Sequence, residues 1–398
     1  MNLNKIGLLP RILMAIVLGL ALGSFLPLGW VRLFATFNGV FSQFLGFMIP
    51  LIIVGLVTPA IGEVGRGAGR LLLATVAVAY LDTALAGLLA YGTGTAFFPR
   101  MVEAAQANAA VAQAQVIEPY FTVKIPPLFD VMSALIFSFV LGLGIAYGSP
   151  KLPGDSQTSS MTSLKGVTRE FREIIAKTIS AALIPLLPLY IFGIFLQMMV
   201  SGEAYRILIV FAQIIFVIFI LHVVILLYEF VIAGGLTHKN PLRLLWTMMP
   251  AYMTALGTAS SAATIPVTLR QTIKNGASEQ VAGFTVPLCA TIHMSGSAMK
   301  ITACALTICL LEGIPHDFMT FLHFILMLGI VMVAAPGVPG GAIMAALAPL
   351  GFILGFTPDQ QALMIALYIA MDSFGTACNV TGDGAIALVI DKYCRTTQ

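Results

Sequence analysis

The sequence contains very little charge for its length. Only 9% of its 398 residues are Asp, Glu, Lys or Arg, whereas soluble domains carry about 25%. Hydrophobic residues make up 59% of the chain, so the few charges are too sparse to cover a water-exposed surface. The composition excludes an ordinary soluble domain and predicts an integral membrane protein. The formal net charge of +3 is too small to indicate a nucleic-acid partner.

Paired cysteines are also lacking. The five cysteines are Cys289, Cys304, Cys309, Cys378 and Cys394, and no two of them form a CxxC pair. All lie in or beside apolar segments, and their number is odd. A disulfide framework or a structural zinc site is therefore not expected. We interpret them as small, buried hydrophobic side chains.

Long apolar segments are what the sequence has in quantity. They cover residues 10–30, 34–61, 71–97, 127–148, 178–200, 205–235, 281–311 and 361–390. Each is long enough to form a transmembrane helix. No small-residue cleavage pattern follows the first segment, so we predict a retained spanning helix there and not a signal peptide. The predicted fold class is an all-α integral membrane protein with eight transmembrane helices, and residues 1–398 form one polytopic unit.

Two further apolar stretches, residues 244–268 and 321–352, are interrupted at their centres. Small residues (259–263) interrupt the first, and a Pro- and Gly-rich run (336–341) interrupts the second. A straight spanning helix does not favour such a centre. Non-helical backbone at membrane depth must line a cavity or be buried in protein. We therefore predict two re-entrant helical hairpins.

The positions of lysine and arginine support this topology. With the N-terminus inside, the residues that lie outside are Arg32, Arg100, Lys124 and Arg206. Of the 20 lysines and arginines, Lys300 lies within a span and the remaining fifteen lie inside, an excess typical of cytoplasmic loops. Both termini are then cytoplasmic. Residues 244–311 and 321–390 each form a hairpin followed by a helix, in opposite orientations, which is the inverted-repeat architecture of secondary transporters.

A polar stripe crosses the last apolar segment. Asp372, Thr376, Asn379 and Asp383 follow one another at spacings of four, three and four residues, which places them on one face of an α-helix. Carboxylates within a membrane are costly unless they face a partner, an ion or a water-filled cavity. The stripe therefore indicates a site for something cationic. The structural alternative is a buried ion pair with Lys300, or a helix-end carboxylate in the case of Asp383.

Five short stretches carry a resemblance to a known family. They are Asn240-Pro241, residues 258–268 (TASSAATIPVT), residues 286–297 (VPLCATIHMSGS), residues 337–342 (GVPGGA) and residues 379–383 (NVTGD). In their order and spacing across residues 238–392, they resemble the dicarboxylate/amino acid:cation symporters, the group that contains the glutamate transporter homologues. The first half of the chain agrees in hydropathy and in scattered Gly and Pro positions.

The resemblance implies an elevator-type secondary transporter in a bacterial inner membrane. A homotrimer would hold scaffold helices of approximately residues 7–61 and 120–200. The transport part, approximately residues 70–98 and 205–393, would contain both hairpins. The implied partners are an amino acid, a monovalent cation and the lipid bilayer. No catalytic residue is implied, and no cofactor besides the coupling cation, Na⁺ and/or H⁺.

The same resemblance implies which residues bind substrate. Asp372 would pair with the α-ammonium group, and Asn379 and Thr376 would approach the α-carboxylate, roles that suit a carboxylate, an amide and a hydroxyl. The other implied substrate residues are Ser260, Ser261, Ser297, Val338, Gly340, Gly341 and Gly375. The serines have an alternative role as a tightly packed turn. The glycines are also explained by backbone geometry alone.

Cation ligands are implied as well. Asp383 would supply the main carboxylate. Cys289, Thr291, His293 and Asn379 would complete the shell, partly through backbone oxygens.

Three positions depart from the family's pattern. Where Gly375 stands, the family usually has an arginine or a neutral replacement, and losing the arginine favours an amino acid with a neutral side chain. The alternative is a dicarboxylate or acidic amino acid, with Lys300 in place of the arginine.

His293 and Ser295 replace an amide and a carboxylate of one sodium site, so His293 either carries a proton or is a neutral packing histidine. Lys300 has further alternatives, a tethered charge at that cation site or a pair with Glu229 or Asp82.

Two rival functions remain to be weighed against cation-driven symport. An ion channel predicts polar residues lining several helices, but here they gather in one half of the chain. A membrane hydrolase would use Ser260 or Ser297 with His293, and it requires an orienting residue and an oxyanion site. The sequence contains no hydrolase motif, so we do not expect an enzyme.

Overall fold

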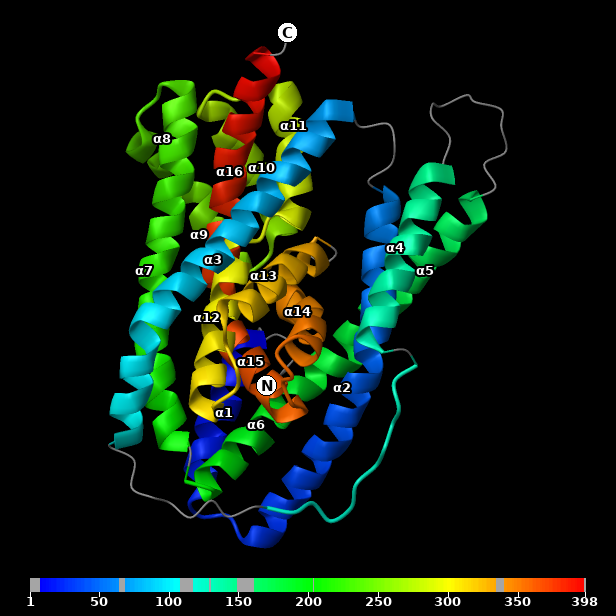
Figure 1. Ribbon diagram of the computed structural model, residues 1–398, viewed down its shortest axis with the longest axis vertical. Coiled ribbons are helices and arrows are strands. Elements are labelled where there is room, and N and C mark those ends of the chain that lie inside the picture. Colours follow the sequence, from blue (N-terminus) through cyan, green and yellow to red (C-terminus); the bar gives the residue numbers. More distant parts are fainter. Residues whose placement is uncertain are drawn as a thin grey trace.

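The computed structural model describes residues 8–63, 69–107, 117–128, 130–148, 161–202, 204–333 and 340–396. All regular structure within these ranges is helical (Figure 1). The helices are α1 (Leu8–Gly23), α2 (Leu28–Glu63), α3 (Gly69–Ala107), α4 (Val131–Gly148), α5 (Thr162–Thr178), the π-helix η2 (Ile179–Leu183), α6 (Ile184–Val200), α7 (Ala204–Thr237), α8 (Pro241–Thr247), α9 (Met249–Thr258), α10 (Ser261–Lys274), α11 (Glu279–Ile292), α12 (Ser295–Glu312), α13 (Phe318–Met332), α14 (Gly341–Phe352), α15 (Pro358–Ala370) and α16 (Asp372–Thr396).

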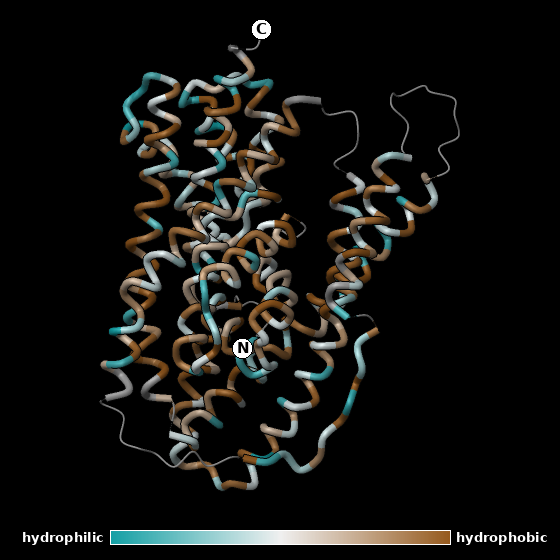
Figure 2. The backbone as a smooth tube through the Cα atoms, viewed as in Figure 1, coloured by the Kyte–Doolittle hydropathy of each residue, from teal (hydrophilic) through white to brown (hydrophobic). Residues whose placement is uncertain are grey.

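Several helices are long and apolar enough to cross a membrane. In the described ranges these are Leu28–Pro59, Leu71–Ala104, Thr162–Val200, Ile207–Thr237 and Glu279–Glu312, and α15 with α16 adds a sixth if that bent pair is one span. Most residues of α7 are apolar, for example, so brown predominates along its part of the backbone tube (Figure 2). The predicted first and fourth spans correspond to shorter apolar stretches, Pro10–Gly23 and Ile136–Gly148. The protein is a multi-pass membrane protein, and the count of eight spans remains a prediction.

Helix packing divides the chain into two groups. In one group, α2 packs against α4, α5 and α6, and α1 packs along α6. In the other, α12 packs against α3 and α7, while α16 packs against α7, α9, α10, α11 and α12. Figure 1 shows α2, α4 and α5 beside the denser group that contains α3, α7 and α16. The helices α14 and α15 contact both groups.

Several helices are broken where the sequence predicts a hairpin or a straight span. The first hairpin consists of α9 and α10, which pack together and meet at Ala259 in the left-handed conformation (φ 48°). Its second arm continues to Lys274, beyond the predicted limit at residue 268. The second hairpin consists of α13 and α14, and α14 follows Gly340 at φ 77°. Its predicted tip at residues 336–339 lies outside the described residues.

The last two predicted spans are also broken. His293 and Met294 are non-helical and separate α11 from α12. Met371 separates α15 from α16, whose axes differ by 64°. Backbone groups freed at such breaks need partners inside the protein. These two breaks therefore mark where polar contacts should concentrate.

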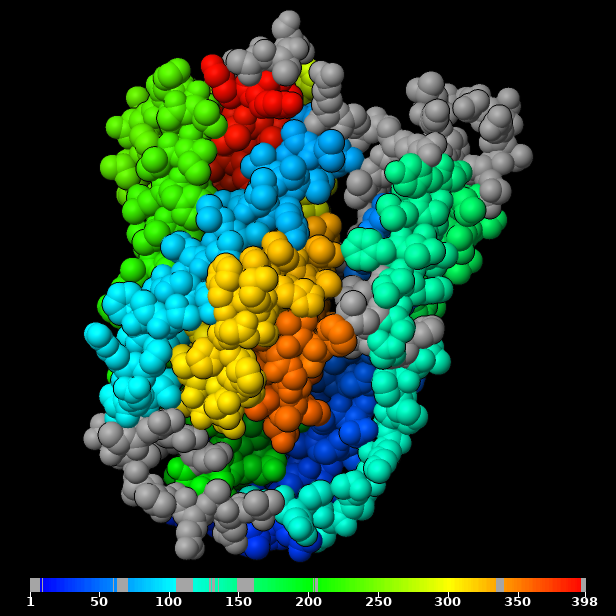
Figure 3. Space-filling view, in the orientation of Figure 1, coloured from blue at the N-terminus to red at the C-terminus, as the bar shows by residue number. Residues whose placement is uncertain are grey.

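The helices α12 and α16 form the centre of the second group. In α12, every residue from Ser295 to Cys309 is buried inside the protein, and so is Leu311. On the face shown in Figure 3, α16 (red) is visible only near its C-terminal end, between α7 and α3. A helix that is buried all round can carry polar side chains only if they find partners there. The site is formed by those partners.

Candidate functional site

All four residues of the predicted stripe are buried on α16. The exposed fractions are 6% for Asp372, 7% for Thr376, 4% for Asn379 and 1% for Asp383. Because α16 starts at Asp372 after the bend at Met371, this carboxylate lies in the first helical turn, where the helix dipole favours negative charge. The stripe therefore extends inward from a helix N-terminus.

Asp372 connects α16 to the second hairpin. The backbone N–H of Gly340 donates a hydrogen bond of 2.7 Å to Asp372 Oδ2. The hydroxyl of Tyr368 also interacts with this carboxylate. Thr376 donates its hydroxyl to the Asp372 carbonyl at 3.0 Å, within its own helix. The sequence-predicted residues Asp372 and Gly340 are thus in direct contact, so the hairpin and the carboxylate form one unit.

Asn379 is held from α12. Its Oδ1 accepts the N–H of Gly296 at 2.9 Å, and its Nδ2 donates to Ser297 Oγ at 3.2 Å. Ser297 in turn shares a hydrogen bond of 2.9 Å with the hydroxyl of Tyr368. The chain of contacts from Asn379 to Tyr368 leads back to Asp372. The sequence places Asn379 and Ser297 in one site, and the structure brings them together.

Lys300 fills the space beside Gly375. Its side chain is buried, its Nζ donates to the carbonyl of Met371 at 3.0 Å, and Nζ lies 4.1 Å from the ring centre of Tyr368. A Cβ atom added to Gly375 would lie 2.2 Å from this Nζ. Among the described residues, the Lys300 ammonium forms no ion pair. A cation from α12 therefore occupies the position that Gly375 on α16 leaves open.

His293 lies between carboxylates from three helices. Its Nδ1 is 2.9 Å from Asp383 Oδ1 on α16, and its Nε2 is 2.9 Å from Asp82 Oδ2 on α3 and 3.9 Å from Glu229 Oε1 on α7. A neutral imidazole has one N–H, whereas an imidazolium donates from both nitrogens. If Asp82 and Asp383 are both ionised, His293 can donate a hydrogen bond to each of them only as the imidazolium.

Two further hydrogen bonds complete this carboxylate cluster, which consists of Asp82, Glu229 and Asp383 around His293. Tyr228 donates to Asp82 Oδ1 at 2.9 Å, and Ser295 donates to Glu229 Oε1 at 3.0 Å. Glu229 Oε2 is buried and has no hydrogen-bond partner among the described residues. Ligand atoms of Asp82, Glu229 and His293 all lie within 4.8 Å of one another. Three carboxylates in this setting require compensating positive charge.

The other predicted cation ligands lie around the break between α11 and α12. The carbonyl of Cys289 accepts the N–H of His293 at 2.8 Å. Thr291 is exposed, and its hydroxyl donates to Leu288 O in its own helix at 2.7 Å. The structure therefore does not bring the Thr291 side chain into the carboxylate cluster. A role for Cys289 or Thr291 through backbone oxygens remains a prediction.

The predicted serines of the first hairpin lie at its tip. Ser260 is the N-cap of α10, where its Oγ accepts the N–H of Ala263 at 3.3 Å, and Ser261 is the first residue of that helix. Gly341 starts α14. Val338, the remaining predicted substrate residue, lies outside the described residues.

Sequence reasoning did not assign four residues to this site. It left out Tyr228 and Tyr368, and it considered Asp82 and Glu229 as possible partners of Lys300. The sequence did contain an indication for Asp82 and Glu229. Both are carboxylates inside apolar segments, where acidic residues are costly and usually functional. The sequence alone could not decide whether Lys300 faces Gly375 or pairs with Asp82 or Glu229. The structure places Asp82 and Glu229 on His293, so neither of them is the partner of Lys300.

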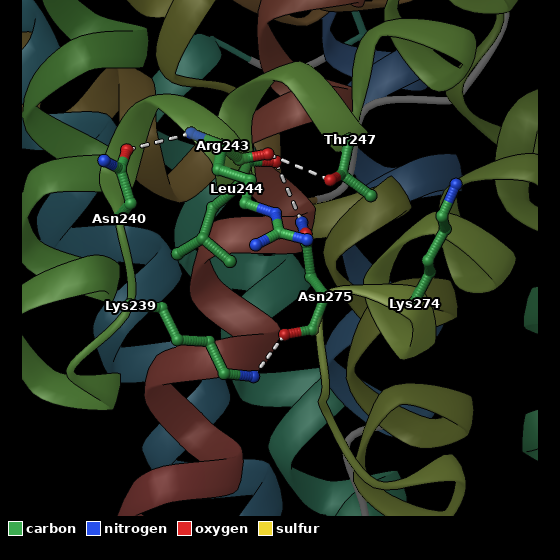
Figure 4. Close-up of a pocket in the computed structure, with 7 residues that line it drawn as sticks. All are labelled: Lys239, Asn240, Arg243, Leu244, Thr247, Lys274 and Asn275. Carbon is green, nitrogen blue, oxygen red and sulfur yellow. Dashed lines mark hydrogen bonds between the residues drawn. The ribbon is translucent and has the colours of Figure 1, made fainter.

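A concave region lies apart from this site, at the junction of α7, α8 and α10, and it contains none of the predicted substrate or cation residues. This pocket of about 390 Å³ is lined by Lys239, Asn240, Arg243, Leu244, Thr247, Lys274 and Asn275 (Figure 4).

Comparison with known proteins identifies a family that matches nearly the whole chain and relatives that match part of it. Residues 8–393 match the family described as the sodium:dicarboxylate symporter family. Neutral amino acid transporter B(0) of Mus musculus is 31% identical over 163 residues, which are 41% of this chain and 29% of that protein. Excitatory amino acid transporter 5 of Homo sapiens is 30% identical over 171 residues, 43% of this chain and 30% of that protein. The chain thus spans less than a third of the length of the curated relatives it matches.

Proposed function

We propose a function from one established premise: the chain belongs to the sodium:dicarboxylate symporter family. Its relatives are transporters and not enzymes. The proposed function is uptake of an amino acid by alternating access, driven by a cation gradient. The observation that carries this proposal is the contact between Gly340 of the second hairpin and Asp372, on the helix whose Asp383 faces His293. One helix thereby connects a gate, a substrate group and a cation group.

The substrate part of the site suits the α-amino acid group. Asp372 is a buried carboxylate in an apolar setting, and an ammonium group is its natural ligand. The amide of Asn379 and the hydroxyl of Thr376 are donors for a carboxylate. When substrate binds, its α-ammonium and the N–H of Gly340 are both donors to the carboxylate of Asp372. This links occupancy of the site to the position of the second hairpin.

The cation part is the carboxylate cluster around His293. Three acids from α3, α7 and α16 converge there, and burial makes their uncompensated charge costly. Arrival of Na⁺ or H⁺ would lower that cost. Since Asn379 and Asp383 lie one turn apart on α16, a change at the cluster reaches the substrate residues through one rigid element.

The substrate side chain has two candidate classes. Gly375 by itself favours a neutral side chain, because it leaves space and no charge. A specific observation favours the second class, a dicarboxylate or acidic amino acid. The Nζ of Lys300 lies where a side chain at residue 375 would project, and its ammonium is hydrogen-bonded to one carbonyl. A second carboxylate on the substrate is a fitting partner for that ammonium.

The architecture around the site is part of the proposal. We propose that α1, α2, α4, α5 and α6 form the scaffold of a homotrimer. The group containing α3 and α7–α16 would move across the membrane as the transport part. The bacterial inner membrane, with both termini in the cytoplasm, is the proposed location. It agrees with the predicted topology, in which fifteen lysines and arginines lie on the cytoplasmic side.

Uptake into proteoliposomes tests the proposal. Radiolabelled neutral and acidic amino acids are offered to the purified protein under a Na⁺ gradient alone, a pH gradient alone, or neither. We expect accumulation of at least one amino acid under at least one gradient. We also expect Asp372→Asn to reduce it by at least about tenfold, the effect of losing a charged hydrogen-bond partner. Asp130→Asn, the same change at an exposed position just before α4, is the matched control and should retain uptake. Uptake that is intact in Asp372→Asn would overturn the ammonium assignment.

A further inference from the structure

The pocket at the junction of α7, α8 and α10 is positively charged. Lys239, Arg243 and Lys274 line it, and its other lining residues are uncharged. They approach from the loop after α7, from α8 and from the last turn of α10 (Figure 4). Its volume of about 390 Å³ is within the range of small-molecule sites. Three cations around one concave surface attract an anion.

These cations are not neutralised by the protein. Lys239 donates to the carbonyl of Asn275 at 2.5 Å, which leaves two of its N–H groups. In the part of the chain that the structure describes, Arg243 and Lys274 form no ion pair. Figure 4 shows that the Arg243 backbone N–H donates to Asn240 and that its carbonyl accepts from the Thr247 hydroxyl, and it shows no hydrogen bond from the guanidinium group to the residues drawn. The pocket therefore holds uncompensated charge and free donors, as an anion-binding site requires.

The surface beside the pocket is apolar and exposed. On α8, Leu242 is 65% exposed and Trp246 is 77% exposed, and their spacing of four residues places them on one helix face. The helix follows directly after the apolar span Ile207–Thr237. Tryptophan at the end of a span is typical of the membrane interface. We therefore expect the pocket to lie at headgroup depth, beside side chains suited to acyl chains.

We propose that this pocket binds the phosphodiester headgroup of an anionic phospholipid from the inner leaflet. Arg243 and Lys274 contact the phosphate, and Leu242 and Trp246 contact the adjoining hydrocarbon. The apolar face is the reason for choosing a lipid over free phosphate, which would gain nothing from it. Because α10 is the second arm of the first hairpin, the bound lipid joins α8 to that hairpin at the membrane surface.

Tryptophan quenching tests this site directly in the full-length protein. The two tryptophans are Trp30 and Trp246, so Trp30→Phe leaves Trp246 as the reporter beside the pocket. The protein is reconstituted with brominated phosphatidylglycerol or brominated phosphatidylcholine at equal mole fractions. We expect Trp246 to be quenched preferentially by phosphatidylglycerol. Arg243→Gln with Lys274→Gln should lower that preference about 25-fold, since each cation near an anionic surface contributes about a fivefold factor.

Two controls keep the test decisive. Lys165→Gln with Lys177→Gln removes two predicted inner cations outside the pocket and should leave the preference unchanged. Arg243→Lys with Lys274→Arg conserves both charges and should also retain it. Equal quenching by the two lipids in Trp30→Phe would overturn the proposal. So would quenching by phosphatidylglycerol that millimolar inorganic phosphate abolishes, because free phosphate would then be the ligand.

Discussion

Lys300 and Gly375 share one space although they belong to different helices. The ammonium lies 2.2 Å from where a Cβ of residue 375 would be, so a larger residue at 375 requires the end of the Lys300 side chain to move. Lys300 also has a structural role, because its Nζ donates to the carbonyl of Met371, where α15 ends and a cation is favourable. Binding substrate and capping α15 are two roles with different experimental consequences.

Replacing Lys300 separates these roles. If its ammonium binds a substrate carboxylate, Lys300→Met should weaken binding of acidic amino acids about ten- to hundredfold, because a charge-assisted hydrogen bond contributes about 1.5–3 kcal/mol. Binding of neutral amino acids should be retained. Lys300→Met with Gly375→Arg returns the cation from α16 and should restore the acidic preference. Competition against a labelled substrate measures all three proteins.

The contrary outcome is equally specific. If Lys300→Met lowers thermal stability but leaves the ratio of acidic to neutral binding unchanged, Lys300 only caps α15. Lys177→Met, which removes a lysine far from the site, is the control for the loss of one positive charge. It should change neither quantity.

Some contacts of the site residues can be predicted from the sequence, and others cannot. Asp372, Asn379 and Asp383 are predictable as one buried face because helix periodicity is a local property. The partners of His293 are not predictable in this way, since Asp82 and Glu229 come from helices far away in the sequence. Which of the acids reaches His293 and which reaches Lys300 depends on the rotation of α3 and α7 about their axes. Only packing determines that rotation.

At the scale of elements, the breaks in helices carry the site. The tip of the first hairpin was predictable from residues 259–263, because small residues in an apolar run disfavour a straight span. The breaks at His293–Met294 and at Met371 interrupt segments that the sequence shows as continuous and apolar. His293, Met294 and Met371 are neither proline nor glycine, so the local sequence does not predict these breaks. Tertiary hydrogen bonds to the freed backbone, such as Lys300 to Met371, stabilise them.

Gly340 allows a test of the second hairpin as a gate. It has φ 77°, a conformation that costs alanine about 1–2 kcal/mol, and its N–H holds Asp372. Gly355 has a similar φ of 69° with open space around it, and it serves as the matched control. Gly340→Ala and Gly355→Ala should lower stability by a similar amount, on the order of 1 kcal/mol. Only Gly340→Ala should weaken substrate binding, by about tenfold, as calorimetry can measure. Equal affinities in both variants would contradict the gate.

At the scale of the whole molecule, function depends on how the two packing groups meet. The scaffold group and the denser group share contacts through α14 and α15. The helix α14 is an arm of the second hairpin, and α15 ends just before Asp372. Composition and charge distribution predict a multi-pass membrane protein directly. Long apolar segments suit the bilayer only as helices, and the lysines and arginines gather in the loops of one predicted side. They do not determine which surfaces slide, since both groups have apolar exteriors. Alternating access therefore remains a proposal that rests on family membership and on the linked site.

The central claim is that a cation and an amino acid bind to one coupled unit on α16. The most direct measurement is the equilibrium affinity for a transported amino acid in lipid nanodiscs, as a function of Na⁺ concentration at fixed pH and of pH at fixed Na⁺. We predict that at least one of the two cations changes the affinity by about fivefold or more, the usual lower range of coupling between sites. We also predict that Asp383→Asn removes this dependence. An affinity that is independent of both Na⁺ and pH in the unmodified protein would contradict the claim.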